Sequence, residues 1–414
     1  MKISLLLNRE PFPEILVETM ERYFSVVECM PYRVEWRERS LFERITFQTQ
    51  AQEWLCNPLI NAIFAASARS EVLELPRRWY GTGPTLARTA TQRAYVFAAT
   101  SPIMRRALAG PAILIDPMPA NPCSLLITGG NTRLRLFNFD KGEATTILKS
   151  RFDESFITAD LAVRTAHPWL PAPPVLDVLD DGRAYKEPIL SLSTAGKGLT
   201  AVARHHALAQ AVGACERLSL ETSERTYLKD YANRLLGQCQ DIATVLGTRN
   251  PGIKAPIDSS IAKIRAAAEA VIDDRKSQMW IGQSHGDLAP GNILADADAF
   301  YLIDWERTAK RMRGFDAITL ALAARRCPTG LLNRARRLIA AAGDFGPAAV
   351  AAREALTGQS SKQTHARLLI YLAEELLFHL EENHPAPIAP PTLALARLLA
   401  ELQSDGLFPE VEGN

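Results

Sequence analysis

The sequence predicts a fold of the α+β class that is built from more than one compact unit. Three short stretches with alternating apolar and polar residues follow one another between about residues 123 and 149, a pattern typical of antiparallel strands. Most of the chain after Thr200 has the apolar spacing of amphipathic helices instead. Because a chain of 414 residues exceeds the usual size of one hydrophobic core, we expect two or three packed units.

Composition excludes several broad classes of protein. Hydrophobic residues make up 47% of the chain, charged residues make up 22%, and the formal charge of +1 gives no reason to expect nucleic acid or a membrane surface as a partner. The apolar run at the start is too short for the core of a signal peptide, so we expect a cytoplasmic protein. The six cysteines are scattered without a Cys-x-x-Cys pair, which argues against a zinc knuckle or a disulfide scaffold.

The first segment, residues 1–116, is predicted to form an accessory domain of α/β or helical type. It begins with a strand-like run, "KISLLL", and continues with a helical pattern in "PEILVETMERYF". The stretch from "LFERITFQTQAQEWL" to "TQRAYVFAATSPIMRRALAG" is predicted to be rich in helix. The stretch "IDPMPANP" has three prolines, which interrupt helices and remove donors from strands, so we expect a domain boundary near Asp116.

Residues 117–190 are predicted to form a small antiparallel sheet with one helix. The runs "SLLIT", "RLRLFNF" and "ATTILKS" are separated by the turns "GGNT" and "DKGE", which predicts three strands in succession. A helix is expected in "DESFITADLAVRTA", and two more short strands in "PWLPAPPVLDVLDDGRAYKEPILSL". Residues 191–414 are expected to form a mostly helical unit.

The segment "IGQSHGDLAPGNILADADAFYLIDWE" places a histidine, several acids and an asparagine between apolar runs. Phosphoryl transfer requires a carboxylate to orient the attacking hydroxyl, together with oxygen ligands for Mg²⁺. The spacing lets Asp287 face a substrate while Asn292 faces a metal ion. After a short loop, the run "FYLI" is expected to return antiparallel and to bring Asp304 near Asn292. The hairpin therefore has the residues of a catalytic centre.

The motif "HGDLAPGNIL…LIDWE" resembles the catalytic loop and metal-binding strand of the aminoglycoside phosphotransferase and choline kinase group. The resemblance implies a two-lobed protein-kinase-like fold, with a small antiparallel sheet lobe and a mostly helical lobe. It also implies that Asp287 is the catalytic base, that His285 supports the catalytic loop, and that Asn292 and Asp304 bind Mg²⁺. Asp316, in "RGFDAITLAL", is expected to cap the following helix and to anchor the loop.

A kinase of this group also needs a nucleotide site in the sheet. A strand, a glycine turn and a second strand can cradle phosphates with backbone amides, and "LLITGGNTRLRLF" has this pattern. The resemblance implies that Gly129, Gly130 and Asn131 cover the phosphates of ATP. It further implies that Lys149, at the end of "ATTILKS", pairs with the α- and β-phosphates.

An acid should hold this lysine, and the sequence leaves the choice open. Glu154 and Asp160 both follow Lys149, and Asp160 is preferred because it lies deeper in the predicted helix. The adenine is expected to pair with backbone groups around Glu187 to Ile189, where the resemblance places the connection between the lobes.

The expected function is ATP- and Mg²⁺-dependent phosphorylation of a hydroxyl on a small molecule, such as a sugar, an amino sugar or an amino alcohol. The alternatives are a kinase of a glycan or lipid-linked sugar, and a pseudokinase that binds nucleotide as a scaffold. The accessory domain could recognise the acceptor, pair two subunits or dock a partner enzyme. The acids of the predicted helix "YLAEELLFHLEENH" could attract a cationic acceptor, but an acidic helix face is usually solvated, so we place them outside the site; they are Glu374, Glu375, Glu381 and Glu382.

Overall fold

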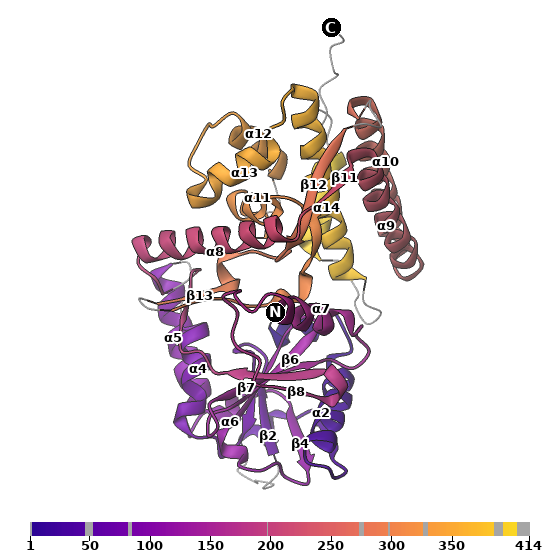
Figure 1. Ribbon diagram of the computed structural model, residues 1–414. Coiled ribbons are helices and arrows are strands. Elements are labelled where there is room, and N and C mark those ends of the chain that lie inside the picture. Colours follow the sequence, from indigo (N-terminus) through magenta and orange to yellow (C-terminus); the bar gives the residue numbers. More distant parts are fainter. Residues whose placement is uncertain are drawn as a thin grey trace. The chain divides into compact units, whose positions relative to one another are not determined.

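The computed structural model describes residues 2–45, 53–81, 85–196, 198–272, 277–296, 299–325, 330–384 and 392–403. The chain divides into two compact units, each described by itself (Figure 1). The sheet unit comprises residues 1–158 and 174–190, and the helical unit comprises residues 159–173 and 191–414. The structure confirms the α+β class, because antiparallel sheets and helices occupy largely separate parts of the sequence.

One nine-stranded sheet forms the centre of the sheet unit, with the strand order β1-β4-β2-β3-β5-β6-β7-β9-β8. The elements of the sheet unit are α1 (Ile3–Leu6), α2 (Phe12–Val27), β1 (Arg33–Arg37), α3 (Leu41–Ile45), β2 (Glu53–Asn57), β3 (Ala62–Ala65), α4 (Ser70–Tyr80), α5 (Leu86–Thr100), α6 (Arg105–Leu108), β4 (Ala112–Asp116), β5 (Leu125–Gly129), β6 (Arg133–Asn138), β7 (Glu143–Leu148), β8 (Asp177–Leu179) and β9 (Ala184–Pro188), with the first part of α7 (Ser155–Ala166).

The strands β5, β6 and β7 are the three that the alternating pattern predicted, and β8 and β9 are the two expected after the helix. The sheet does not end at the proline-rich stretch near Asp116. Strand β3 pairs with β5, with Ile63 opposite Ile127, so the first 116 residues and the predicted nucleotide sheet share one set of hydrogen bonds. The compact unit therefore differs from the predicted ranges 1–116 and 117–190, because strand pairing continues across the loop.

Two expectations for the first segment were wrong. "KISLLL" contains the short helix α1 rather than a strand, and its Ile3 and Leu6 are buried against the sheet. "EWL", expected to be helical, lies in β2, where Trp54 pairs with Ala65. Residues 46–52, which were predicted to be helical as well, lie outside the described residues. Short apolar runs of this kind have no clear period, so strand pairing and burial decide their structure.

Helices cover both faces of the sheet (Figure 1). Helices α1 and α2 pack on one face, where Leu16 and Met20 meet the strand residues Ile127 and Ile147. Helices α4 and α5 pack on the other face, against strand residues such as Phe64. Lys149 follows β7 and has the same parity as Ile147, so its side chain belongs to the face that α1 and α2 cover.

The helical unit is built around the long, buried helix α14 and two small sheets. Its elements are the second part of α7, β10 (Ser193–Thr194), α8 (Ala201–Glu221), β11 (Glu224–Tyr227), α9 (Leu228–Arg249), α10 (Pro251–Val271), β12 (Gln278–Ser284), β13 (Ile293–Ala295), β14 (Phe300–Leu302), β15 (Ala309–Met312), α11 (Phe315–Ala321), α12 (Leu331–Ile339), α13 (Ala349–Leu356), α14 (Ser361–Asn383) and α15 (Leu393–Gln403). Among the described residues, no helix has the length and apolar character needed to cross a bilayer.

The acidic residues of α14 do not all face solvent, which corrects the expectation for this helix. The side chains of Glu374 and Glu375 are 0% and 1% exposed. Glu374 accepts hydrogen bonds from the Met312 backbone amide (2.8 Å) and from the Tyr231 hydroxyl. Burial raises the pKa of Glu374 from its ordinary value to about 7. The helix is apolar nearly all round, so these two acids lie within the core and must be satisfied there.

We expect Glu374→Gln to stabilise the protein above pH 7. The raised pKa of Glu374 means that the folded state keeps a proton that the unfolded chain loses, so stability falls as pH rises from about 4.5 through about 7. The loss is on the order of 3 kcal/mol above that range. A glutamine retains the acceptor oxygen, so thermal unfolding should show a higher midpoint for the variant at pH 8 and convergence with the parent near pH 5.

The matched control is Glu269→Gln, which removes an exposed carboxylate from α10 and should leave the pH profile unchanged. A lower unfolding midpoint for Glu374→Gln than for the parent at pH 8 would show that the charged form of Glu374 stabilises the core.

Candidate functional site

The loop between β12 and β13 places the His-Gly-Asp motif in the helical unit. The His285 ring lies 4.5 Å from the Trp305 ring, and both side chains are buried. Its Nε2 lies 3.0 Å from the Ile303 carbonyl oxygen, and its Nδ1 accepts the Asp287 backbone amide at 3.3 Å. These partners assign the ring proton to Nε2. The His285 ring is therefore hydrogen-bonded within the loop, and its part in the catalytic site stays a prediction.

The buried carboxylate of Asp316 anchors the catalytic loop. Asp316, in the first turn of α11, accepts the backbone amides of His285 (2.7 Å) and Gly286 (2.9 Å). It anchors the loop as expected, but its side chain does not cap its own helix. Gly286 has a φ of +83°, and a Cβ there would lie 1.9 Å from the Arg307 carbonyl oxygen. Only glycine fits this position, since both the backbone conformation and the close approach exclude a side chain.

Asp287 is held by a cation and an amide. Its Oδ1 accepts Nε of Arg325 at 2.9 Å, and its Oδ2 accepts Nδ2 of Asn292 at 3.1 Å. Burial raises the pKa of the Asp287 carboxyl, and the charge of Arg325 acts in the opposite direction. The side chain is still 30% exposed, so a substrate hydroxyl can reach the carboxylate. This environment suits a general base whose position is fixed.

Arg325 and its supports were missed by the sequence analysis. Its Nη1 pairs with Glu375 at 2.5 Å, its Nη2 donates to the Gly286 carbonyl at 3.0 Å, and its guanidinium lies 3.5 Å from the Phe378 ring centroid. Arg325 follows α11, and Glu375 and Phe378 lie on α14, far from the motif in sequence. The available signal was the acidic pair of α14 within an otherwise apolar helix, because buried acids require partners.

The hairpin brings the two predicted metal ligands to one end. Strands β13 and β14 pair with Ile293 opposite Leu302, and the Ile303 amide donates to the Asn292 carbonyl at 3.0 Å. Asp304 follows in the left-handed conformation, with φ +65°. Nδ2 of Asn292 is bonded to Asp287, which leaves its Oδ1 as the atom that can bind a cation.

This donor set fits Mg²⁺ rather than a softer metal. Magnesium prefers oxygen ligands and usually takes only one or two carboxylates from a protein, and here an amide oxygen and the Asp304 carboxylate are offered. Within the described ranges, no group of three or more His, Cys, Asp and Glu side chains is arranged to hold a metal ion. A zinc-type site is therefore not part of this portion of the chain.

In the sheet unit, part of the predicted phosphate cradle is already engaged. Asn61 accepts the Gly129 amide (3.2 Å) through Oδ1 and donates to the Gly129 carbonyl (2.9 Å) through Nδ2. A Cβ on Gly129 would lie 2.9 Å from side-chain atoms of Ile3 and Leu6. The Gly129 amide is thus committed within the protein, and Gly130 and Asn131 remain the candidates for a phosphate. Asn131 has a buried Oδ1 without a hydrogen-bond partner among the described residues.

Lys149 pairs with an acid that the sequence analysis did not consider. Its Nζ lies 2.5 Å from Oε1 of Glu10, which immediately precedes Pro11 and α2. Glu154 instead pairs with Arg183 at 2.5 Å. The pairing of Asp160 with Lys149 stays a prediction.

Asp160 lies in the part of α7 that belongs to the helical unit, and its carboxylate pairs there with Arg164 at 3.4 Å. The expected adenine-binding segment is the end of β9. Glu187 is buried and lies 4.0 Å from Arg135, and the Ile189 amide donates to the Gly142 carbonyl at 2.8 Å. The Ile189 amide is therefore already used within the sheet unit, so an adenine contact there depends on other backbone groups.

A cavity of about 230 Å³ adjoins the catalytic loop within the helical unit. Leu288, Ala289 and Pro290, which follow the base, line one side, and Arg325 also borders it. The remaining lining residues are mostly apolar and come from α8, α11 and the stretch before α13; they are Arg204, Leu208, Thr319, Leu320, Ala321, Ala323, Asp344, Phe345, Gly346, Pro347 and Ala348. This cavity lies beside the predicted chemistry.

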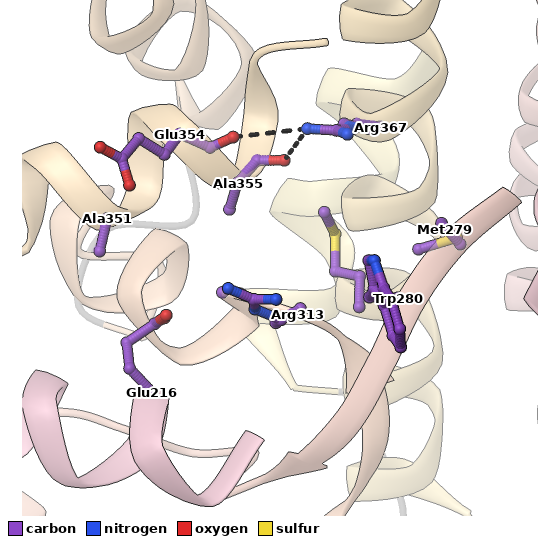
Figure 2. A pocket seen from close by; sticks show the side chains of 10 residues that line it. Glu216, Met279, Trp280, Arg313, Ala351, Glu354, Ala355 and Arg367 are labelled. Atoms are coloured by element: carbon purple, nitrogen blue, oxygen red, sulfur yellow. Dashed lines mark hydrogen bonds between the residues drawn. The ribbon is translucent and has the colours of Figure 1, made fainter. Parts of the chain in front are cut away.

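Figure 2 shows a second cavity, of about 220 Å³, bordered by β12 and α13. Arg367 is directed at the carbonyl oxygens of Glu354 (3.4 Å) and Ala355 (3.3 Å), so it satisfies the end of α13. Burial raises the pKa of Glu216 in its wall, and Arg313 opposes this shift. Its lining includes no residue of the catalytic loop, and we assign it no role in the chemistry.

No protein-family model matches the sequence, and no curated protein matches it. Solved structures do resemble it. A choline/ethanolamine kinase family protein from Mesorhizobium loti is 15% identical, covers 75% of this chain and 93% of its own, and has a TM-score of 0.40. The aminoglycoside phosphotransferase APH(4)-Ia, in a ternary complex with ADP and hygromycin B, is 12% identical, covers 70% and 95%, and has a TM-score of 0.42.

A macrolide 2′-phosphotransferase type I is 15% identical, covers 78% of this chain and 99% of its own, and has a TM-score of 0.39. These structures are of kinases and phosphotransferases, the group that the His-Gly-Asp motif resembles.

Proposed function

We propose that this protein is an ATP- and Mg²⁺-dependent phosphotransferase that acts on a hydroxyl of a small molecule. The observation that carries the proposal is the arrangement of the catalytic hairpin. The Asp287 carboxylate is fixed yet partly exposed, it bonds to Asn292, and Asp304 follows two residues after Leu302, the last residue of β14 that pairs with β13. A base next to two oxygen ligands for Mg²⁺ supports phosphoryl transfer rather than hydrolysis by a metal-bound water.

The chemistry follows from these positions. Asp287 orients the acceptor hydroxyl and takes its proton as the hydroxyl oxygen forms a bond to the γ-phosphorus. The bond between that phosphorus and the β–γ bridging oxygen breaks, and ADP leaves with the electron pair. Asn292 and Asp304 would hold the Mg²⁺ ion, which supplies positive charge to the phosphate oxygens. Arg325 keeps the Asp287 carboxylate in one orientation throughout.

The cavity beside the loop supports an acceptor with a compact apolar part. Leu208, Leu288 and Phe345 contribute to its wall, and the charged residues there are Arg204, Arg325 and Asp344. Asp344 already accepts the Gly346 amide at 2.8 Å. This wall offers no cluster of acids, so a polycationic acceptor is less well matched than a neutral sugar derivative or a small alcohol.

A pseudokinase that binds nucleotide without turnover is the second candidate. The observation that favours it is the direct ion pair between Arg325 and Asp287, because a cation on the carboxylate weakens it as a base. The two candidates share nucleotide binding and differ in turnover, so a test of the base separates them.

We expect ATP to raise the midpoint of thermal unfolding when Mg²⁺ is present and to raise it less when EDTA is added. A ligand that binds only the native state stabilises that state by mass action. Asp304→Asn should remove most of the difference between Mg²⁺ and EDTA, because the neutral amide is a weaker ligand for the metal.

The control is Asp296→Asn, on the exposed loop of the same hairpin, which should retain the full Mg²⁺ effect. An absent shift at millimolar ATP and Mg²⁺ in the parent protein would reject nucleotide binding. An unchanged Mg²⁺ effect in folded Asp304→Asn would assign that aspartate a structural role only.

A further inference from the structure

The first residues of the chain supply the partner of the predicted nucleotide lysine. Glu10 and Lys149 are separated by 139 residues, yet Oε1 and Nζ lie 2.5 Å apart. Their side chains are 1% and 0% exposed. An ammonium in such a place requires a negative partner, since an unpaired buried charge is strongly disfavoured and the group would lose its proton. Glu10 supplies such a partner, and the charged ammonium is the form of a lysine that attracts phosphate.

The surroundings fix the direction of the lysine side chain. Its Nζ lies 4.8 Å from the ring centroid of Phe152 and 5.8 Å from that of Phe12, which begins α2. Aromatic rings at these distances attract a cation. Burial raises the pKa of Glu10, and the charge of Lys149 acts against that shift. The pair thus consists of two mutually dependent charges in an apolar setting.

The same N-terminal segment, residues 3–12, also holds the glycine turn. Asn61 bridges the two, because its Oδ1 accepts both the Ile3 amide (2.9 Å) and the Gly129 amide (3.2 Å). The Lys149 amide in turn donates to the Thr132 carbonyl of that turn at 3.0 Å. A segment that only covered the lysine would not need to fix the turn as well. The N-terminal segment therefore fixes the positions of both Lys149 and the glycine turn.

We propose that Glu10 is the positioning residue for Lys149, so that the N-terminal segment is a working part of the site for the nucleotide phosphates. This inference rests on the proposed function, because it assumes that Lys149 binds ATP. It gives the first part of the chain a role in nucleotide binding that was expected of Glu154 or Asp160.

The test compares ligands with and without phosphates. Binding of ATP, ADP and adenosine, each with Mg²⁺, is measured by isothermal titration calorimetry on the full chain. Glu10→Gln should lower the affinity for ATP and for ADP by about tenfold or more, as expected when a charged hydrogen bond that orients a ligand group is lost. Adenosine should bind as it does to the parent. Glu10→Asp, which keeps the charge on a shorter side chain, should recover part of the ATP affinity.

The control is Glu18→Gln, on α2, which removes an exposed partner of Arg151 and should bind all three ligands like the parent. Lys149→Met should lower the affinity for ATP as much as Glu10→Gln does. The double variant should bind ATP no more weakly than either single variant, because both substitutions remove the same interaction. Should Glu10→Gln fail to fold, the comparison of Glu10→Asp with the parent decides the point.

The outcomes separate this inference from the proposed function. Failure of the parent to bind ATP would reject both. If the parent binds ATP tightly and Glu10→Gln binds it equally well or more tightly, the inference alone is rejected. Tighter binding by the variant would mean that the N-terminal segment keeps Lys149 away from the phosphates. A parallel loss of ATP and adenosine binding would also overturn it, because that result indicates a structural role.

Discussion

Asp287→Asn is expected to bind Mg²⁺-ATP about as well as the parent and to lose on the order of 10² or more in the rate of phosphoryl transfer. The amide retains the shape of the side chain but cannot take a proton from the acceptor. Its effect should therefore appear in turnover rather than in nucleotide affinity. The hydrogen bonds from Arg325 and Asn292 fix the position of the carboxylate, so the loss of turnover can be assigned to the missing base.

The assay begins with a panel of sugars, amino sugars, amino alcohols and glycan fragments, and follows ADP release above background hydrolysis with the parent protein. Asp296→Asn serves as the control for a charge change on the same hairpin. Parent-like turnover of Asp287→Asn on a genuine acceptor would remove the catalytic assignment. A panel without any acceptor-stimulated turnover would favour the pseudokinase.

Arg325→Met is expected to destabilise the helical unit by about 3 kcal/mol or more. Methionine can keep the apolar contact with Phe378, but it leaves Glu375 buried without its cation. It also releases the Asp287 carboxylate, so turnover should fall in whatever protein remains folded. Chemical denaturation followed by circular dichroism measures the first effect, and ADP release measures the second.

Two variants make this test specific. Glu375→Gln in the Arg325→Met background should restore part of the stability, since no buried charge is then left unpaired. Arg204→Met changes an exposed arginine of the same cavity and should leave stability close to that of the parent. If Arg325→Met unfolds like the parent, the buried ion pairs contribute little and the account of Asp287 must change.

Local sequence was sufficient for the catalytic hairpin and for the strands next to it. His285 to Asp304 lie within one continuous stretch, and two short strands with a loop between them are enough to bring Asn292 and the end of β14 together. The alternating runs of β5, β6 and β7 likewise encode both the strands and their order. In these cases the partners are neighbours in the chain, so periodicity and turn residues determine the contacts.

The N-terminal region shows where this reasoning fails. "KISLLL" is compatible with a strand or a helix, and its structure depends on packing against Gly129 and on the hydrogen bond that the Ile3 amide donates to Asn61. The proline-rich stretch after Asp116 was predicted to be a domain boundary, but a loop does not separate units when the strands on either side share a sheet. Strand pairing between distant segments has no signature in a single sequence.

The sequence by itself determined the residue types of the site and the hairpin that carries Asp287, Asn292 and Asp304, because these depend on short-range order. Only the tertiary structure decided which charges meet. Glu10 pairs with Lys149 in the sheet unit although the two lie far apart in the sequence, and Arg325 pairs with both Asp287 and Glu375 in the helical unit. A buried charge is strongly destabilising unless it is paired with an opposite charge. The packing of helices and strands that are far apart in the chain determines which oppositely charged side chains lie close enough to pair.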